Sequence, residues 1–218
     1  MQQTIQGNAV VTASKKKQRS QSSPSLYTLR VELIDIHPVI WRRIHVDGRV
    51  RLGALHHILQ AAMGWSDAHL HQFEIRDKHY GVPDPEYDDL DCEMLDEKKS
   101  RLNQLLDVGD TGIYLYDFGD SWQHSLTVES IKDIGDRDPG VRGAWIEDGE
   151  RACPPEDAGG AGQFQDFLEL LENDPYGEET KRIQEWAGLD YDPARFDRLA
   201  ANNAIARMLW NGWIKIGA

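Results

Sequence analysis

Beyond residue 25 the chain alternates between apolar and polar positions with a period of two. Such alternation is typical of strands that are buried on one face. A His-Pro pair at residues 37–38 interrupts it, so we expect two strands joined around this pair. Arg42 falls on the apolar side of the second strand as an irregularity. The apolar positions are Leu29, Val31, Leu33, Ile40, Ile44 and Val46.

A helix and a further strand are predicted next. Apolar residues recur at helical spacing from Leu52 to Ala62, and Gly64 is a natural stop for a helix. Eight of the fourteen residues from 84 to 97 are acidic, which indicates a solvent-exposed segment, a solvated excursion from the domain. A short helix over 98–106 is predicted to follow it. Between these segments, four residues lie two apart and would share one strand face: His69, His71, Phe73 and Ile75.

The second half of the chain predicts a hairpin, a long loop and three helices. Residues 113–118 and 122–131 form the hairpin, with a Gly-Asp pair at its turn. Residues 132–162 are rich in glycine and indicate a long loop. Two helices are expected around 164–171 and 183–186. A third is expected to begin at Asp192, an N-cap followed by proline at the first helical position.

The order of these elements is that of an α+β protein. It is compatible with a β-grasp-like mixed sheet packed on a helix, with additional C-terminal helices. Residues 1–25 are Ser/Gln-rich with few apolar side chains, and we expect a disordered tail. The α+β domain is expected over 26–200, and a C-terminal helical extension over 201–218.

Charge and cysteine content narrow the function classes. A net charge of -13 argues against broad nucleic-acid binding, which depends on Lys and Arg neutralising phosphates. Cys92 and Cys153 form no CxxC pair and suit a reducing compartment. No apolar run approaches the length of a membrane span. We therefore expect a cytoplasmic protein that has no membrane partner and no strong nucleic-acid partner.

Four motifs stand out and occur in one order. They are IWRR at 40–43, MGW at 63–65 followed by HLHQF at 69–73, YDFGDSWQH at 116–124, and PPED at 154–157 with Gly159 and Gly160. In this set the chain resembles the plasmid pRiA4b ORF-3-like family, over roughly residues 26–196. The resemblance implies an α+β fold with a β-grasp-like core. It implies plasmid or mobile-element association, and it brings no established catalytic residues.

The motifs at 116–124 and 154–160 combine acidic side chains with Gly or Pro bends, which suggests a shared polar site. The alternative is structural, because carboxylates beside tight turns commonly accept bonds from backbone N–H groups. Two of the candidates also have a structural explanation. Trp122 would pack in the core, and Arg42 would make a cation–π contact or a salt bridge. The candidate binding residues are Asp117, Asp120, Trp122, His124, Glu156, Asp157 and Arg42.

A metal site is the sharpest chemical hypothesis. Two histidines at alternate positions of one strand, joined by a third on a neighbouring strand, would make a three-histidine face for a divalent metal: His69, His71 and His124. Acidic groups nearby would complete the coordination or support it. The competing reading is a network of half-buried histidines bonded to Asp or backbone.

We rank a non-enzymatic cytoplasmic binding or interaction module first, with an unknown protein or small-molecule ligand and no established cofactor. A metal-dependent hydrolase that uses the His/Asp cluster is second. A DNA-associated accessory protein is third. Some family members carry a transposon-resolvase label, but this sequence shows neither an activated nucleophile nor a cationic cradle for a phosphate.

Overall fold

The computed structural model describes residues 24–83, 93–135, 143–188 and 190–216. Nearly all of the expected disordered tail lies outside these residues, as does most of the acidic segment from 84 onward. The end of that segment contains a short strand, β5 (Met94–Asp96), where we expected a solvated excursion.

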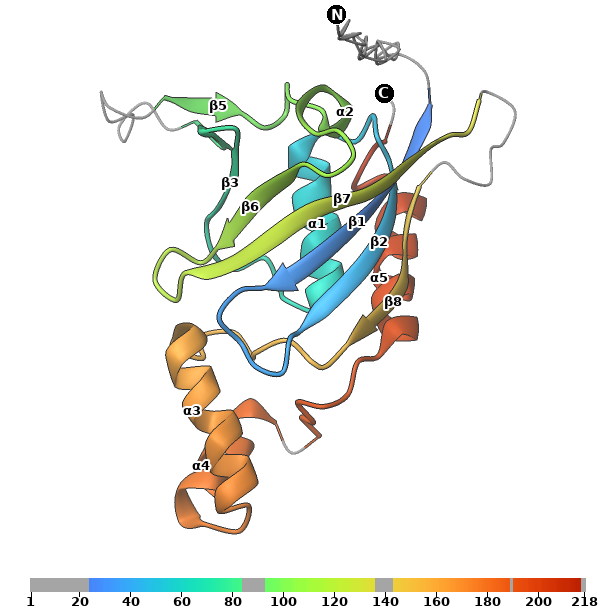
Figure 1. The fold of residues 1–218 in the computed structure, drawn as a ribbon. Coiled ribbons are helices and arrows are strands. Elements are labelled where there is room, and N and C mark those ends of the chain that lie inside the picture. Colours follow the sequence, from blue (N-terminus) through green and yellow to red (C-terminus); the bar gives the residue numbers. More distant parts are fainter. Residues whose placement is uncertain (1–23, 84–92, 136–142, 189, 217–218) are drawn as a thin grey trace, which may run out of the picture.

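An eight-stranded mixed sheet is the centre of the fold (Figure 1), with the strand order β5-β4-β3-β6-β7-β1-β2-β8. Only the pairing of β4 with β5 is parallel. The two N-terminal strands and the later hairpin were predicted from the sequence. The other strands are β1 (Ser25–Leu33), β2 (Trp41–Asp47), β3 (His71–Ile75), β4 (Lys78–Gly81), β6 (Thr111–Tyr116), β7 (Trp122–Asp133) and β8 (Ala144–Glu150).

Helix α1 (Leu52–Met63) crosses one face of the sheet (Figure 1). Its apolar stripe is buried, and each such Leu or Ile side chain contributes about 1.5–3 kcal/mol when removed from water. The helix ends where the sequence predicts, because Gly64 takes a left-handed φ of 94°. The predicted α+β class, with a mixed sheet packed on a helix, is confirmed.

The remaining helices lie along the second half of the chain. α5 packs on α1 and β8, while α3 and α4 extend beyond one end of the sheet (Figure 1). Phe164 of α3 is buried against Trp122 at the start of β7, with 6.5 Å between the ring centroids. These helices are α2 (Leu102–Leu105), α3 (Gly160–Asn173), α4 (Glu178–Ala187) and α5 (Arg198–Trp210).

Arg42 lies on the buried face of β2 and is only 1% exposed. Its guanidinium donates to the carbonyl oxygens of Ala62 (2.9 Å), Trp41 (2.8 Å) and Glu150 (2.8 Å). The ring of Phe196 stacks on it, with 3.7 Å from the guanidinium carbon to the ring centroid. Arg42 therefore ties the end of α1 to the end of β8, and burial lowers its pKa.

Two further expectations about the fold were wrong. Residues 132–162 were expected to form a loop, yet they include β8, whose charged residues are typical of an edge strand. The side-chain amide of Asn202 in α5 covers this edge, since it accepts from the Ile146 N–H (2.8 Å) and donates to the Ile146 carbonyl (3.0 Å).

The start of the third predicted helix was also misplaced. Asp192 caps only a turn, in which its carboxylate accepts from the Ala194 N–H. Asp197 is the N-cap of α5 and accepts from the Ala200 N–H at 2.9 Å. The boundary expected at residue 200 consequently falls inside this helix.

Candidate functional site

Three loops meet at the end of the sheet where β6 turns into β7. The first, residues 64–70, joins α1 to β3; the second, residues 117–121, joins β6 to β7; the third, residues 151–159, joins β8 to α3. Trp65 Nε1 donates to the Pro154 carbonyl at 2.9 Å, and the Gly159 N–H donates to Asp120 Oδ2 at 2.9 Å. The structure thus brings together the two motifs that suggested a shared polar site.

At this junction one imidazole faces three carboxylates, which together form the loop site: His69, Asp117, Glu156 and Asp157. His69 Nε2 lies 3.6 Å from Asp117 Oδ2, 3.8 Å from Glu156 Oε2 and 3.3 Å from Asp157 Oδ1. Ligand atoms of His69, Asp117 and Asp157 all lie within 4.8 Å of one another, so these three residues could hold a metal ion.

Two of the carboxylates are fixed by contacts outside the cluster. Asp117 has a positive φ of 56°, and its Oδ1 accepts from the N–H groups of Gly119 (2.9 Å) and Asp120 (3.3 Å). The other oxygen is thereby left facing His69. Glu156 Oε1 accepts from the Ser66 N–H at 2.8 Å and from the Tyr116 hydroxyl at 3.1 Å. Their positions are therefore set by the fold before any ligand arrives.

Negative charge exceeds positive charge at the loop site. Among the described residues, every ion pair of Asp117, Glu156 and Asp157 runs to His69. Burial raises the pKa of Tyr116 to about 12, with the charge of Glu156 acting in the same direction, so its hydroxyl stays protonated at neutral pH. The Asp157 side chain is 74% exposed, which leaves the cluster open to solvent on one side.

Three other candidate residues, Asp120, Trp122 and Arg42, are not among the residues that face His69. Asp120 holds Gly159 in place, and Trp122 is buried with 1% exposure. Arg42, as described, lies in the core and bonds to backbone carbonyls. The polar cluster expected from the sequence is therefore smaller than proposed, and includes His69 in place of His124.

The expected three-histidine face does not form. His69 precedes β3 and turns to the loop site. His71 Nε2 instead donates to Glu97 Oε2, 2.8 Å away, and the His71 ring stacks on His56. His124 is fully buried, with Nδ1 3.2 Å from the Tyr114 carbonyl. Tyr114 separates His124 from His71, because it pairs with His124 across β6 and β7. The residues share a sheet face but not a site.

Burial lowers the pKa of His124 to about 4, and the nearby charge of Arg42 acts in the same direction. No hydrogen-bond partner for its Nε2 is found among the residues that the structure describes. In the neutral form Nδ1 donates to the Tyr114 carbonyl, and burial outweighs the backbone hydrogen bonds that would favour the charged form. His124 is therefore held neutral in the core.

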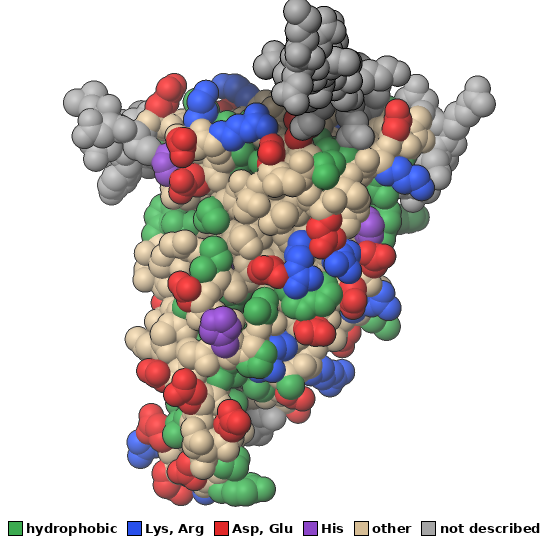
Figure 2. All heavy atoms as spheres, viewed as in Figure 1, with side chains coloured by type: hydrophobic (Ala, Val, Ile, Leu, Met, Phe, Trp, Pro, Cys, Tyr) green, Lys and Arg blue, Asp and Glu red, His purple; other side chains and the backbone are tan. Residues whose placement is uncertain are grey.

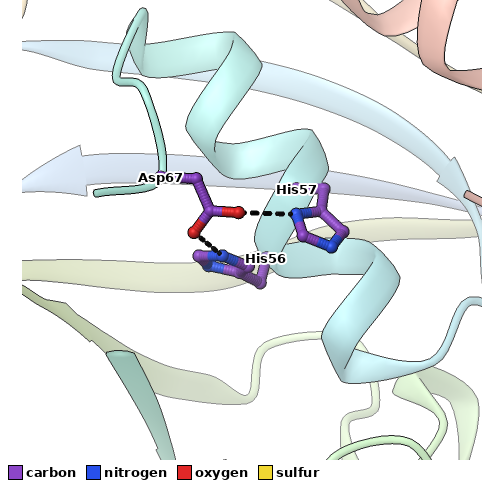
Figure 3. Close-up of side chains that lie close together, drawn as sticks. All are labelled: His56, His57 and Asp67. Atoms are coloured by element: carbon purple, nitrogen blue, oxygen red, sulfur yellow. Dashed lines mark hydrogen bonds and ion pairs between the residues drawn. The ribbon is translucent and has the colours of Figure 1, made fainter. Parts of the chain in front are cut away.

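Sequence reasoning missed a second cluster. His56 and His57 of α1 both contact Asp67, which lies in the loop after the helix (Figure 3). The distances are 2.7 Å from His56 Nε2 and 3.2 Å from His57 Nδ1 to the carboxylate. The signal available in the sequence was the His-His pair inside a predicted helix, where His56 occupies a core-facing position.

None of the helices in the described part of the chain is long and apolar enough to cross a membrane.

The uncharacterised protein y4hQ of Sinorhizobium fredii (strain NBRC 101917 / NGR234) is 39% identical over 186 residues, which cover 83% of this chain and 91% of that protein. The crystal structure of MM3350, a protein of unknown function from Methanosarcina mazei Go1, matches with a TM-score of 0.72 and 34% identity. That match covers 83% of this chain and 98% of the other. A sequence model of the plasmid pRiA4b ORF-3-like proteins matches residues 25–200, and the chain therefore belongs to this family.

Proposed function

We propose that the protein is a binding module whose loop site takes a divalent transition-metal ion. One observation carries the proposal: a single imidazole nitrogen faces oxygens of three carboxylates at 3.3–3.8 Å, with no other ion pair to those carboxylates among the described residues. Like charges this close repel one another, and a bound dication would turn that repulsion into attraction.

The donor set favours particular ions. Imidazole nitrogen suits zinc and the later first-row metals, while carboxylate oxygen suits manganese and the harder cations. One histidine with two or three carboxylates therefore fits Mn²⁺ or Zn²⁺ better than Mg²⁺, which takes oxygen ligands and keeps its waters. Asp117 and Glu156 are held by backbone and hydroxyl donors, so little ordering would be needed when the ion binds.

We favour binding over hydrolysis because hydroxyl donors already occupy Glu156, which would otherwise be a proton acceptor. The hydroxyls of Ser66 and Tyr116 contact Glu156 Oε1 at 3.0 and 3.1 Å, and the raised pKa of Tyr116 makes it a hydrogen-bond donor at neutral pH. A hydrolase would require the bound ion to keep an open position for water beside a proton acceptor. The exposed side at Asp157 supplies access, and a partner molecule or ligand could complete the coordination there.

The charge distribution supports a module that does not bind nucleic acid strongly. On the face shown in Figure 2, Lys and Arg side chains are interspersed with Asp and Glu, and acidic side chains gather over α3 and α4. Binding to nucleic-acid phosphates over a broad surface needs an excess of Lys and Arg over Asp and Glu. We also place the module in the cytoplasm, in keeping with the free, buried thiol of Cys153. Plasmid or mobile-element association is proposed on the family's name alone.

Manganese binding tests the proposal directly. Electron paramagnetic resonance of EDTA-treated protein is expected to show loss of the free Mn²⁺ signal, with a Kd below about 1 mM. Asp157→Asn removes one carboxylate that is 74% exposed, and should weaken Mn²⁺ binding at least about tenfold with little change in stability.

Glu172→Gln is the matched control, because it removes the same charge from an exposed position of α3. Its Mn²⁺ affinity should stay within about twofold of wild type, since screened surface charges act weakly over distance. A full free-ion signal with the wild-type protein would overturn the proposal. Equal weakening by both variants would reduce the effect to general surface charge and would also overturn it.

A further inference from the structure

The cluster of His56, His57 and Asp67 joins α1 to the 64–70 loop and is called the helix site. Its ligand atoms all lie within 4.8 Å of one another. The ligand atoms of a tetrahedral zinc site, at about 2.0–2.1 Å from the ion, lie about 3.3 Å apart. The distance from His57 Nδ1 to Asp67, 3.2 Å, is close to that spacing, whereas the distance from His56 Nε2, 2.7 Å, is that of a hydrogen bond which a bound ion would lengthen.

A closed ring of hydrogen bonds positions two of these three residues. His56 Nδ1 lies 2.8 Å from the Tyr114 hydroxyl, which accepts from Gln60 Nε2 at 2.9 Å. Gln60 Oε1 accepts from the backbone N–H of Asp67 at 2.9 Å. The ring closes where Asp67 Oδ1 accepts from His56 Nε2. The far nitrogen of a metal-bound histidine commonly has such a fixed partner, which sets the ring orientation.

The plane of the His56 ring is fixed from a second direction. The His71 imidazole stacks on it with centroids 3.4 Å apart and planes 4° apart, and Glu97 holds His71 in turn. This packing accounts for His56 and Asp67, but it does not involve His57. The His57 side chain is 44% exposed and nevertheless converges on the second oxygen of the same carboxylate (Figure 3). One histidine would be enough to anchor the loop.

We infer that the helix site binds a zinc-like transition-metal ion through His56 Nε2, His57 Nδ1 and Asp67, with a fourth position open to solvent. Three protein ligands with one open position is the arrangement of zinc sites that accept an exogenous ligand. With an ion on Nε2, neutral His56 would carry its proton on Nδ1 and donate a hydrogen bond to the Tyr114 oxygen, which also accepts from Gln60. The ion then replaces the hydrogen bond that now joins His56 to Asp67.

The helix site and the loop site are separate, although one loop serves both. Asp67 has a positive φ of 60°, and its side chain turns toward α1. His69, two residues later, turns toward Asp117 and Asp157. The donor sets differ as well, since the helix site has two imidazoles and one carboxylate, whereas the loop site has one imidazole and three carboxylates. The inference therefore stands or falls independently of Mn²⁺ binding at the loop site.

Cobalt reports the predicted geometry. Titrating Co²⁺ into EDTA-treated protein is expected to produce the intense visible d–d bands of a low-coordinate, nitrogen-containing site, and Zn²⁺ should displace them. His57→Gln should weaken Co²⁺ binding at least about tenfold, as loss of a direct ligand costs no less than loss of a supporting contact. The side chain is 44% exposed, so the variant is expected to fold.

His79→Gln in β4 is the control, because His79 belongs to neither metal cluster. It should leave the visible bands and the Co²⁺ affinity unchanged. The inference is wrong if the wild-type protein shows only the faint bands of hydrated Co²⁺. It is equally wrong if the bands survive His57→Gln, because the ion would then lie elsewhere.

Discussion

Between pH 7 and pH 4 the wild-type protein is expected to lose about 3 kcal/mol more unfolding free energy than a His124→Asn variant. The folded pKa of His124 is about 4, whereas an unfolded chain protonates histidine near pH 6.5. Each unit of difference corresponds to about 1.4 kcal/mol, so the full shift corresponds to about 3.5 kcal/mol. About 3 kcal/mol of this is lost by pH 4, because the folded protein is then half protonated at His124.

The sign follows from proton uptake. Below about pH 6.5 the unfolded chain binds a proton at His124 that the folded chain does not, so stability falls as the pH falls. Above that pH both states are neutral at this position, and the difference vanishes. Arg42 adds to the cost of protonation, because its guanidinium is buried nearby.

Asparagine is the useful replacement because its side-chain amide can still donate to the Tyr114 carbonyl, where Nδ1 of His124 now points. Urea unfolding at a series of pH values measures the difference between the two proteins. Burial also lowers the pKa of His56, but both proteins contain His56, so its contribution cancels. Parallel pH profiles would show that His124 is not the group responsible.

A second large effect is expected for Gly160→Ala, which should lower the free energy of unfolding by about 2–4 kcal/mol. Gly160 has a φ of 81°, and a Cβ there would lie 2.5 Å from the backbone oxygen of Asp120. A left-handed conformation costs a residue with a Cβ roughly 1–2 kcal/mol, and steric overlap with backbone adds roughly 1–3 kcal/mol. The substitution should also weaken Mn²⁺ binding, because it pushes apart the two loops that carry Asp117 and Asp157.

Gly162→Ala provides the comparison in the same helix. A Cβ at Gly162 meets nothing within 4 Å, and the position lies inside α3. Alanine is expected to stabilise the helix there by up to about 1 kcal/mol. Thermal or urea unfolding of the two variants should therefore give changes of opposite sign. Similar small changes in both would contradict the close packing of the loops.

The sequence predicted the parts of the fold whose side chains repeat with a clear period. α1 and the hairpin of β6 and β7 are examples, because local pattern and burial agree in both. β8 was missed because an edge strand has only one neighbouring strand and needs few apolar residues. Its place in the sheet depends on contacts with Asn202, more than fifty residues away in the chain.

The candidate site was predicted only in outline. Acidic turns at 117–120 and 156–157 pointed to a shared site, since Gly and Pro bends leave carboxylates at exposed turns. Alternation misled us for His69, because the chain leaves the strand geometry where Ala68 donates to the Tyr116 hydroxyl. His57 gave no periodic signal at all, because its role depends on a loop that folds back on the helix.

The contact between Asn202 and Ile146 also limits which strands can pair with the outer edge of β8. An outermost strand presents unpaired N–H and C=O groups that can recruit a strand from another molecule. Here one amide side chain satisfies both groups of Ile146, and Arg198 donates to the neighbouring Glu147 carbonyl. A chain cut short before α5 would uncover β8 as a template, and its copies would be prone to pair edge to edge into aggregates.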